Sequence, residues 1–339
     1  MTNKEKYIEF CGQKGNVPVF SQPWWLDAVC QGEWDVILIE QNGKIIASFP
    51  YYKKMKAMGI FTYIEMPKLS QKLGPYIVYD SDKSLKESKK IAYEHEIYNA
   101  IIDKLPKFDN FVVNFDWKYK NWLPFYWRGF KQTTRYTYLL DNIKDHDNRI
   151  KNYAKYKKQN IQKAKKKKLT IKYDLSKEAF YSYFESVICE ERKESVSFSK
   201  KLFERLYDAI HERKTGRTFF CVDKNDNIHA ISMVVWDNEC AYEIISMRKN
   251  KHNNSGGTEF LRDAVIKYVS QFVNRFDIGG SMIKGVEKSY RDYGTQQTEY
   301  YSISKCNSWI LRIIKGIKEE NRFFVNRLRR LNPIKCVPL

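Results

Sequence analysis

The residues best suited to chemistry lie in the last third of the chain. One group, Asn254-Ser255-Gly256-Gly257-Thr258, stands directly before a helical pattern. Glycines at a helix start leave backbone N–H groups free to face a phosphate, and the helix dipole favours an anion there. We therefore predict that Ser255, Gly256, Gly257 and Thr258 bind an anionic cofactor group. The alternative is an ordinary helix N-cap formed by Ser255 or Thr258.

A second group surrounds Asp277, which ends a predicted strand and precedes Gly279-Gly280-Ser281. These glycines allow the backbone to come close to a ligand. Asp277 could serve there as a base, or it could only cap a loop. Asp116 ends an earlier predicted strand in the same way, but we favour the later position because of its glycines.

Arg291 lies in the aromatic segment Tyr290-Arg291-Asp292-Tyr293-Gly294. A guanidinium offers a rigid fork of donors to a phosphate or an oxyanion. The alternative for Arg291 is a surface ion pair with Asp292 or Glu299.

Histidine and cysteine give weaker signals. The five histidines stand in unrelated contexts, and the seven cysteines include no CxxC pair. This pattern fits neither a catalytic triad nor a disulfide framework nor a zinc site, so we expect no metal and a reducing, cytoplasmic location. No stretch reaches about 18 uninterrupted apolar residues, so we also expect no membrane span.

Composition limits the class of protein. The chain has 339 residues, of which 43% are hydrophobic and 15% aromatic, and this excludes a disordered chain. The formal charge of +20 favours anionic partners. Much of it lies in 149–168, with ten basic and no acidic residues, and in 305–339, with nine basic and two acidic residues.

Both basic segments have helical spacing of apolar residues. In 149–168 these are Ile150, Ala154, Ile161 and Ala164, which predict one amphipathic helix packed on the following domain. This helix could bind tRNA or anionic lipid, or it could only present a solvated face. The stripe in 305–331, which begins at Trp309, fits peripheral membrane contact or packing on the first domain.

Internal repetition sets the predicted architecture. Residues 36–49 match 219–232 without a gap. In both segments an apolar run leads to an acidic residue and a turn, and a second apolar run follows, which predicts a β-hairpin. In the same order, helices follow at 83–105 and 257–272, and strands at 110–116 and near 276–278. Each copy closes with a Gln-x-Thr-x-Tyr strand, at Gln132 and Gln296. We predict an α/β (α+β) fold with two tandem domains, 1–148 and 149–304, and a basic C-terminal helix in 305–339.

This order, with Lys72-Leu73-Gly74-Pro75 and the segment 276–301, resembles the Fem-type acyltransferases. The resemblance covers residues 20–310 and implies two GNAT-like domains, each with a mainly antiparallel sheet flanked by helices. It implies transfer of an acyl or aminoacyl group from a CoA ester or an aminoacyl-tRNA to an amine or hydroxyl. The long helical arm of the classical peptidyltransferases is missing between Leu169 and Thr218.

The resemblance also implies roles for single residues. Arg291 would stabilise the negative charge that develops during transfer. Glu190 or Glu191 would serve as base, and Arg192 would hold an acceptor phosphate; the alternative is a solvated helix face. Tyr290, and Trp24 and Tyr52 in the groove between the domains, would contact substrate, although aromatic clusters more often form core. Where the cell-wall enzymes place a phosphate-binding lysine, this chain has Ala28-Val29-Cys30.

The sequence thus predicts an acyltransferase acting by direct attack. Acyl-CoA would be the co-substrate, and no cofactor would be permanently bound. The acceptor would be a cell-envelope or small molecule, and it could be anionic. The alternative is a non-catalytic protein that binds tRNA or an anionic membrane through its basic helices.

Overall fold

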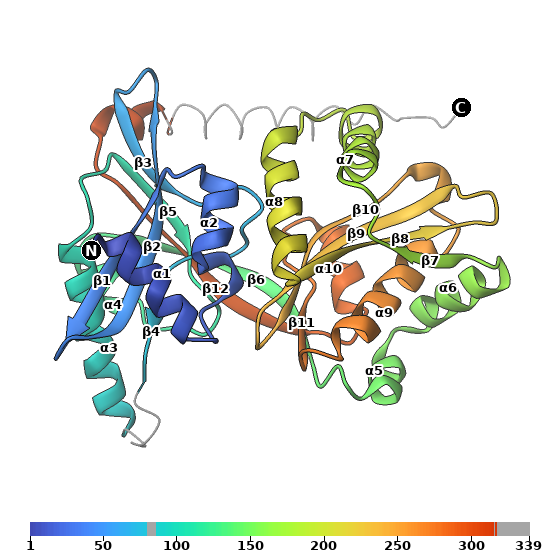
Figure 1. Ribbon diagram of the computed structural model, residues 1–339, viewed down its shortest axis with the longest axis horizontal. Coiled ribbons are helices and arrows are strands. Elements are labelled where there is room, and N and C mark those ends of the chain that lie inside the picture. Colours follow the sequence, from blue (N-terminus) through green and yellow to red (C-terminus); the bar gives the residue numbers. More distant parts are fainter. Residues whose placement is uncertain (80–85, 315, 317–339) are drawn as a thin grey trace.

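The computed structural model describes residues 1–79, 86–314 and 316 (Figure 1). The first half of the chain holds the helices α1 (Asn3–Gln13), α2 (Pro23–Cys30), α3 (Glu87–Asp103) and α4 (Leu123–Trp127). Its strands are β1 (Trp34–Gln41), β2 (Lys44–Lys56), β3 (Phe61–Glu65), β4 (Tyr76–Ile77), β5 (Asn110–Asn114) and β6 (Lys131–Asp141).

The second half repeats this plan after two extra helices and one extra edge strand. Its helices are α5 (His146–Asn152), α6 (Lys155–Lys166), α7 (Lys177–Ser186), α8 (Lys200–Arg213), α9 (Gly257–Val269) and α10 (Lys284–Arg291). Its strands are β7 (Thr170–Tyr173), β8 (Gly216–Val222), β9 (Ile228–Trp236), β10 (Ala241–Arg248), β11 (Arg275–Asp277) and β12 (Gln296–Cys306). Residues 309–314 and 316 are helical, whereas residues 305 and 306 of the predicted C-terminal helix belong to β12. Residues 315 and 317–339 of that predicted helix lie outside the described residues.

The two predicted hairpins are confirmed. β1 pairs with β2, and β8 with β9, both antiparallel. Asn42 and Gly43 have φ values of 50° and 73°, as a type I′ turn requires. The turn between β8 and β9 is stabilised by a side chain instead. The Asp223 carboxylate accepts hydrogen bonds from the N–H groups of Asn225 and Asn227.

The strands of both halves form one sheet. Its order among the described residues is β1-β2-β3-β5-β12-β6-β11-β10-β9-β8-β7, with β4 on β2. The closing strands of the two copies lie side by side at its centre, and each is exchanged into the other half. β6 pairs with β11 of the second half, and β12 pairs with β5 of the first half. The division at residue 148 stays a prediction.

The prediction of a single helix in 149–168 was wrong. The chain forms α5 and α6 there, because Tyr153 takes an extended conformation (φ −66°, ψ 139°) between them. Its buried ring packs edge-on against Tyr293 at 5.1 Å, and the next N–H, of Ala154, donates to the Asp292 carbonyl. Ile161 and Ala164 of α6 are buried, and α6 packs against α9.

Helices cover the second half of the sheet and join it to the first. α9 packs on β8, β9 and β10. Where the halves meet, α8 packs against α2 (Figure 1). One buried apolar cluster includes side chains of both halves, such as Phe20 and Tyr242, whose rings pack at 4.9 Å. Among the described helices, none is long and apolar enough to cross a membrane.

Candidate functional site

The strands β10 and β11 separate at the centre of the sheet. They run parallel and pair through Ala241–Phe276 and Tyr242–Asp277, after which β11 ends and β10 continues to Arg248. β10 is also irregular between Glu243 and Ile245. We call the point beyond Tyr242 and Asp277 the β10–β11 fork. A strand edge that loses its neighbour presents N–H and C=O groups that an extended ligand can pair with.

Asp277 lies at the base of this fork and is completely buried. Its carboxylate forms an ion pair with the buried Lys72 of the first half. It also accepts hydrogen bonds from the Thr137 hydroxyl and, at 2.8 Å, from the Gly279 N–H. A carboxylate with these partners and no exposed surface is poorly placed to take a proton from a substrate. The predicted role of Asp277 as a base is therefore not favoured by its surroundings.

Lys72 is the partner that sequence reasoning missed. Burial lowers the pKa of its ammonium group, but the charges of Asp277 and Asp116 outweigh this effect and raise the pKa above its ordinary value. The ammonium also lies 5.3 Å from the centre of the Tyr242 ring. The signal available was the motif Lys72-Leu73-Gly74-Pro75, but the sequence does not say which acid Lys72 meets.

Gln71 reaches from the first half into the fork. Its Nε2 donates to the backbone carbonyl of Glu243 at 2.9 Å, and a Cβ on Gly279 would lie 3.7 Å from the same nitrogen. Its Oε1 is buried and has no hydrogen-bond partner among the described residues. An unpaired buried acceptor is costly, so this oxygen is a candidate to receive a substrate N–H or O–H. The sequence gave no separate reason to select Gln71.

Glu243 and Arg262 form a second buried pair behind the fork. The guanidinium donates to Glu243 Oε2 at 2.7 and 3.0 Å, and Ser232 donates to Oε1 at 3.0 Å. Arg262 also lies over two aromatic rings, Tyr293 at 5.0 Å and Tyr290 at 5.5 Å. Burial raises the pKa of Tyr290, although the Arg262 charge opposes the change. Sequence reasoning selected Tyr290 as a substrate contact but missed this pair beneath it.

Arg291 ends α10 with an exposed side chain. Its Nε lies 3.7 Å from Glu287. Among the described residues it forms no ion pair with Asp292 or Glu299, the two partners named as the alternative to a catalytic role. Asp292 instead accepts from Lys288 and Tyr156, and Glu299 from Lys120. Much of the guanidinium is therefore open to a ligand. That Arg291 stabilises the negative charge that develops during transfer stays a prediction.

Glu191 and Arg192 lie at the end of a π-helical turn, Val187–Glu191, a distortion common at functional sites. Both carboxylate oxygens of Glu191 accept from the Asn250 N–H, at 2.9 and 3.1 Å. Arg192 lies over the end of β10, where it contacts Met247 Sδ at 3.4 Å. Glu191 thus anchors the loop before α9, and Arg192 is an exposed cation above β10.

The predicted anion loop is closed by α6. Ser255, Gly256 and Gly257 are buried, and Ser255 Oγ accepts from the Gly257 N–H at 3.0 Å. Gly256 has φ +77°, and a Cβ there would lie 2.1 Å from the Asn160 carbonyl oxygen. Thr258 Oγ1 has no partner among the described residues. The glycine at 256 therefore serves close packing of two helices, which argues against a phosphate cradle at this loop.

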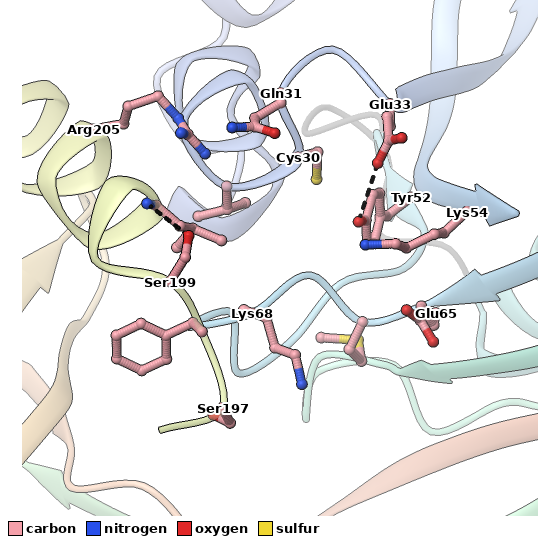
Figure 2. A pocket seen from close by; sticks show the side chains of 14 residues that line it. Cys30, Gln31, Glu33, Tyr52, Lys54, Glu65, Lys68, Ser197, Ser199 and Arg205 are labelled. Atoms are coloured by element: carbon pink, nitrogen blue, oxygen red, sulfur yellow. Dashed lines mark hydrogen bonds between the residues drawn. The ribbon is translucent and has the colours of Figure 1, made fainter. Parts of the chain in front are cut away.

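A pocket of about 270 Å³ lies between the halves (Figure 2). Tyr52 lines it, as predicted for a substrate contact, and donates to Glu33 at 3.3 Å. Lys54, Lys68 and Arg205 bring positive charge to its wall, and the remaining lining residues are Val29, Cys30, Gln31, Glu33, Glu65, Met66, Ser197, Phe198, Ser199 and Leu202. Trp24 is not part of the lining and packs edge-on against Trp25 at 5.7 Å.

The pocket and the fork are neighbours along the chain. Lys68 lines the pocket and Gln71 enters the fork, so their Cα atoms are at most about 11 Å apart. Among the described residues, no group of three or more His, Cys, Asp and Glu side chains could hold a metal ion.

Comparisons with known proteins identify the fold. No protein-family model matches the chain, and no curated protein matches it. A crystal structure of FemX matches over 93% of this chain and 98% of its own, with a TM-score of 0.65 and 13% identity. L-PGS from Bacillus licheniformis matches over 91% and 94%, with a TM-score of 0.52 and 11% identity.

A third structure is the C-terminal domain of a putative lysylphosphatidylglycerol synthetase from Agrobacterium fabrum. It matches over 93% of this chain and 96% of its own, with a TM-score of 0.53 and 9% identity. These matches confirm the mixed α/β fold that the sequence resemblance predicted, and the chain has the fold of FemX.

Proposed function

We propose that the protein is an acyltransferase of the Fem and GNAT type. The observation that carries the proposal is the β10–β11 fork, into which the first half inserts Gln71 and its unpaired Oε1. An extended acyl donor would pair with the edge of β10 beyond Tyr242. The acceptor would approach from the pocket between the halves, past Lys68.

The reaction would be direct attack. The nitrogen or oxygen of the acceptor forms a bond to the acyl carbon, and the bond from that carbon to the donor sulfur or oxygen breaks. The acceptor loses a proton to a base or to water, and the leaving group gains one. Gln71 Oε1 would orient the attacking group, and Arg291 would stabilise the oxyanion. Glu191 remains the proposed base, whereas Asp277 would position Lys72 and the segment containing Gln71.

Surface charge near α9 supports an anionic donor. Lys163, Lys166 and Lys167 are exposed at the end of α6, and Lys167 Nζ contacts the Asn254 carbonyl at 3.4 Å. An anionic donor, either a CoA ester or an aminoacyl-tRNA, would meet these cations. No bound cofactor is required for this chemistry.

The test is thermal stability with acetyl-CoA, longer acyl-CoA esters and aminoacyl-tRNA, each with and without Gln71→Leu. A donor at 100 times its dissociation constant should stabilise the fold by about 2.7 kcal/mol. A shift with one donor would support the proposal and identify the donor class. No shift with any of them would overturn it.

The second candidate is a non-catalytic binding protein for RNA or another polyanion. The exposed lysines of α6 and of 165–168 favour it. It predicts RNA binding with a steep salt dependence that disappears when Lys165, Lys166, Lys167 and Lys168 are changed to Gln. Binding that is unchanged by these substitutions would exclude this use of α6.

A further inference from the structure

Two separate elements expose large apolar side chains at one end of the molecule. The turn between β2 and β3 presents Met58, which is fully exposed, together with Met55 and Ile60. The helical turn 309–314 presents Trp309, which is 68% exposed, together with Ile310, Ile313 and Ile314. We call these seven side chains the apolar end.

Asp109 brings the two elements together. Its carboxylate accepts from the Thr62 N–H at 2.8 Å, directly after the turn, and Thr62 pairs with Met55. Its backbone carbonyl accepts from the Asn307 N–H at 2.8 Å, directly before the helical turn. Figure 1 shows the same arrangement, with the β2–β3 turn and the start of the C-terminal helix at the upper left.

The fold does not account for this exposure. Leu311 of the helical turn is buried and anchors it, so the neighbouring Trp309, Ile310, Ile313 and Ile314 are not needed for that contact. At the β2–β3 turn, Ala57 and Met58 have φ values of 52° and 53°, a conformation that non-glycine residues rarely adopt. A contiguous group of exposed apolar side chains commonly marks an interaction site.

Positive charge surrounds the apolar end. Lys53 and Lys107 are exposed, as is Arg312 within the helical turn. Neither 51–64 nor 300–316 contains an aspartate or glutamate, and the Asp109 carboxylate between the two elements accepts the Thr62 N–H. Apolar side chains with tryptophan, flanked by lysine and arginine, are the composition that binds an anionic lipid surface.

We propose that the apolar end docks on an anionic membrane surface. The side chains of Met58, Ile60 and Trp309 would enter the interface, and the flanking cations would contact lipid phosphates. The inference uses different residues from the proposed acyl transfer, so one can fail while the other holds. Burial of an apolar side chain at the interface contributes in proportion to its area, so two such residues should change binding measurably.

The test is sedimentation of the full chain with vesicles of phosphatidylcholine alone or mixed equally with phosphatidylglycerol. The chain offers a matched pair of double variants. Met58→Ser/Ile60→Ser removes two side chains of the apolar end. Met282→Ser/Ile283→Ser removes the same residue types from another exposed site, where they are 72% and 68% exposed.

We expect binding to the mixed vesicles and much weaker binding to phosphatidylcholine. The Met58/Ile60 variant should bind about tenfold or more weakly, whereas the Met282/Ile283 variant should bind like the unchanged chain. Equal binding by both variants, or no binding of the unchanged chain, would overturn the proposal. The rival occupant of the apolar end is a second copy of the chain. If the Met58/Ile60 variant changes only the oligomeric state, the surface is a self-interface and the proposal is wrong.

Discussion

Lys72 and Asp277 form a buried ion pair across 205 positions of sequence, and it joins the first half of the chain to the second. The pair lies directly beside Gln71 and beneath the β10–β11 fork. It therefore fixes the place where the two halves meet, which is also the place where we propose that acyl transfer occurs.

Removing one member of this pair should be strongly destabilising. Lys72→Met or Asp277→Asn leaves the other group buried without its partner, which costs about 3–5 kcal/mol. The double variant should be more stable than either single variant. Urea denaturation of all four proteins measures the coupling, and additive losses would show that the two groups do not interact.

The same pair predicts a pH dependence. The folded pKa of Lys72 lies above its ordinary value of 10.5. Its contribution to stability is therefore fully present below pH 10.5 and is lost as the pH rises through the folded pKa. Unfolding free energies measured from pH 9 upward should fall for the unchanged chain, and the fall should be smaller for Lys72→Met.

Arg291→Ala should abolish transfer and leave the melting temperature nearly unchanged. The side chain is 60% exposed, and its Nε is 3.7 Å from Glu287, so little stability depends on it. Glu287→Gln is the matched control, because it removes the same ion pair and keeps the guanidinium. If Arg291→Ala retains full activity in a donor-consumption assay, the oxyanion role is refuted.

Gln71→Leu should lower kcat by about tenfold to a hundredfold, because the group that orients the acceptor is lost. The lost hydrogen bond to the Glu243 carbonyl should cost about 1–2 kcal/mol of stability. Gln71→Glu keeps an acceptor at the Oε1 position but places a charge there. Steady-state kinetics with donor and acceptor varied separately would test this role. If Gln71 only supports the structure, the kcat of the folded fraction should be unchanged.

Gly256→Ala tests whether this glycine serves packing. The added Cβ would meet the Asn160 carbonyl at a backbone with positive φ, so we expect a loss of at least about 2 kcal/mol. Gly285→Ala in α10, where a Cβ meets nothing within 4 Å, should change stability by less than about 1 kcal/mol and in the stabilising direction. Thermal unfolding of the two variants compares them directly; equal stability would contradict the packing role.

Local pattern was enough to predict many elements. The Asn42-Gly43 turn and the repeated hairpins are specified by neighbouring residues, and so are most helices. The break at Tyr153 was not predictable in this way, because its cause is the ring of Tyr293, 140 positions later.

The site depended even more on distant contacts. Asp277 and Arg291 could be selected from residue type and from the family resemblance. Sequence patterns could not select Lys72, Gln71, Glu243 or Arg262. Each of these residues is recognised only by its contact with a partner that the folded sheet brings close to it. The packing of α6 against the loop at Gly256 was also not predictable from the sequence, because Asn160 contributes only its backbone carbonyl to the contact.

The exchanged strands have a consequence for the order in which the protein can fold during synthesis. The first half needs β12 beside β5, yet β12 is the last of the described strands to be made. Until the ribosome has released residues 296–306, the edge of β5 is unpaired and open to mispairing. We therefore expect that a nascent chain ending before Gln296 leaves one edge of β5 and one edge of β6 unpaired, and that the two halves of the sheet join only when β12 inserts between these strands.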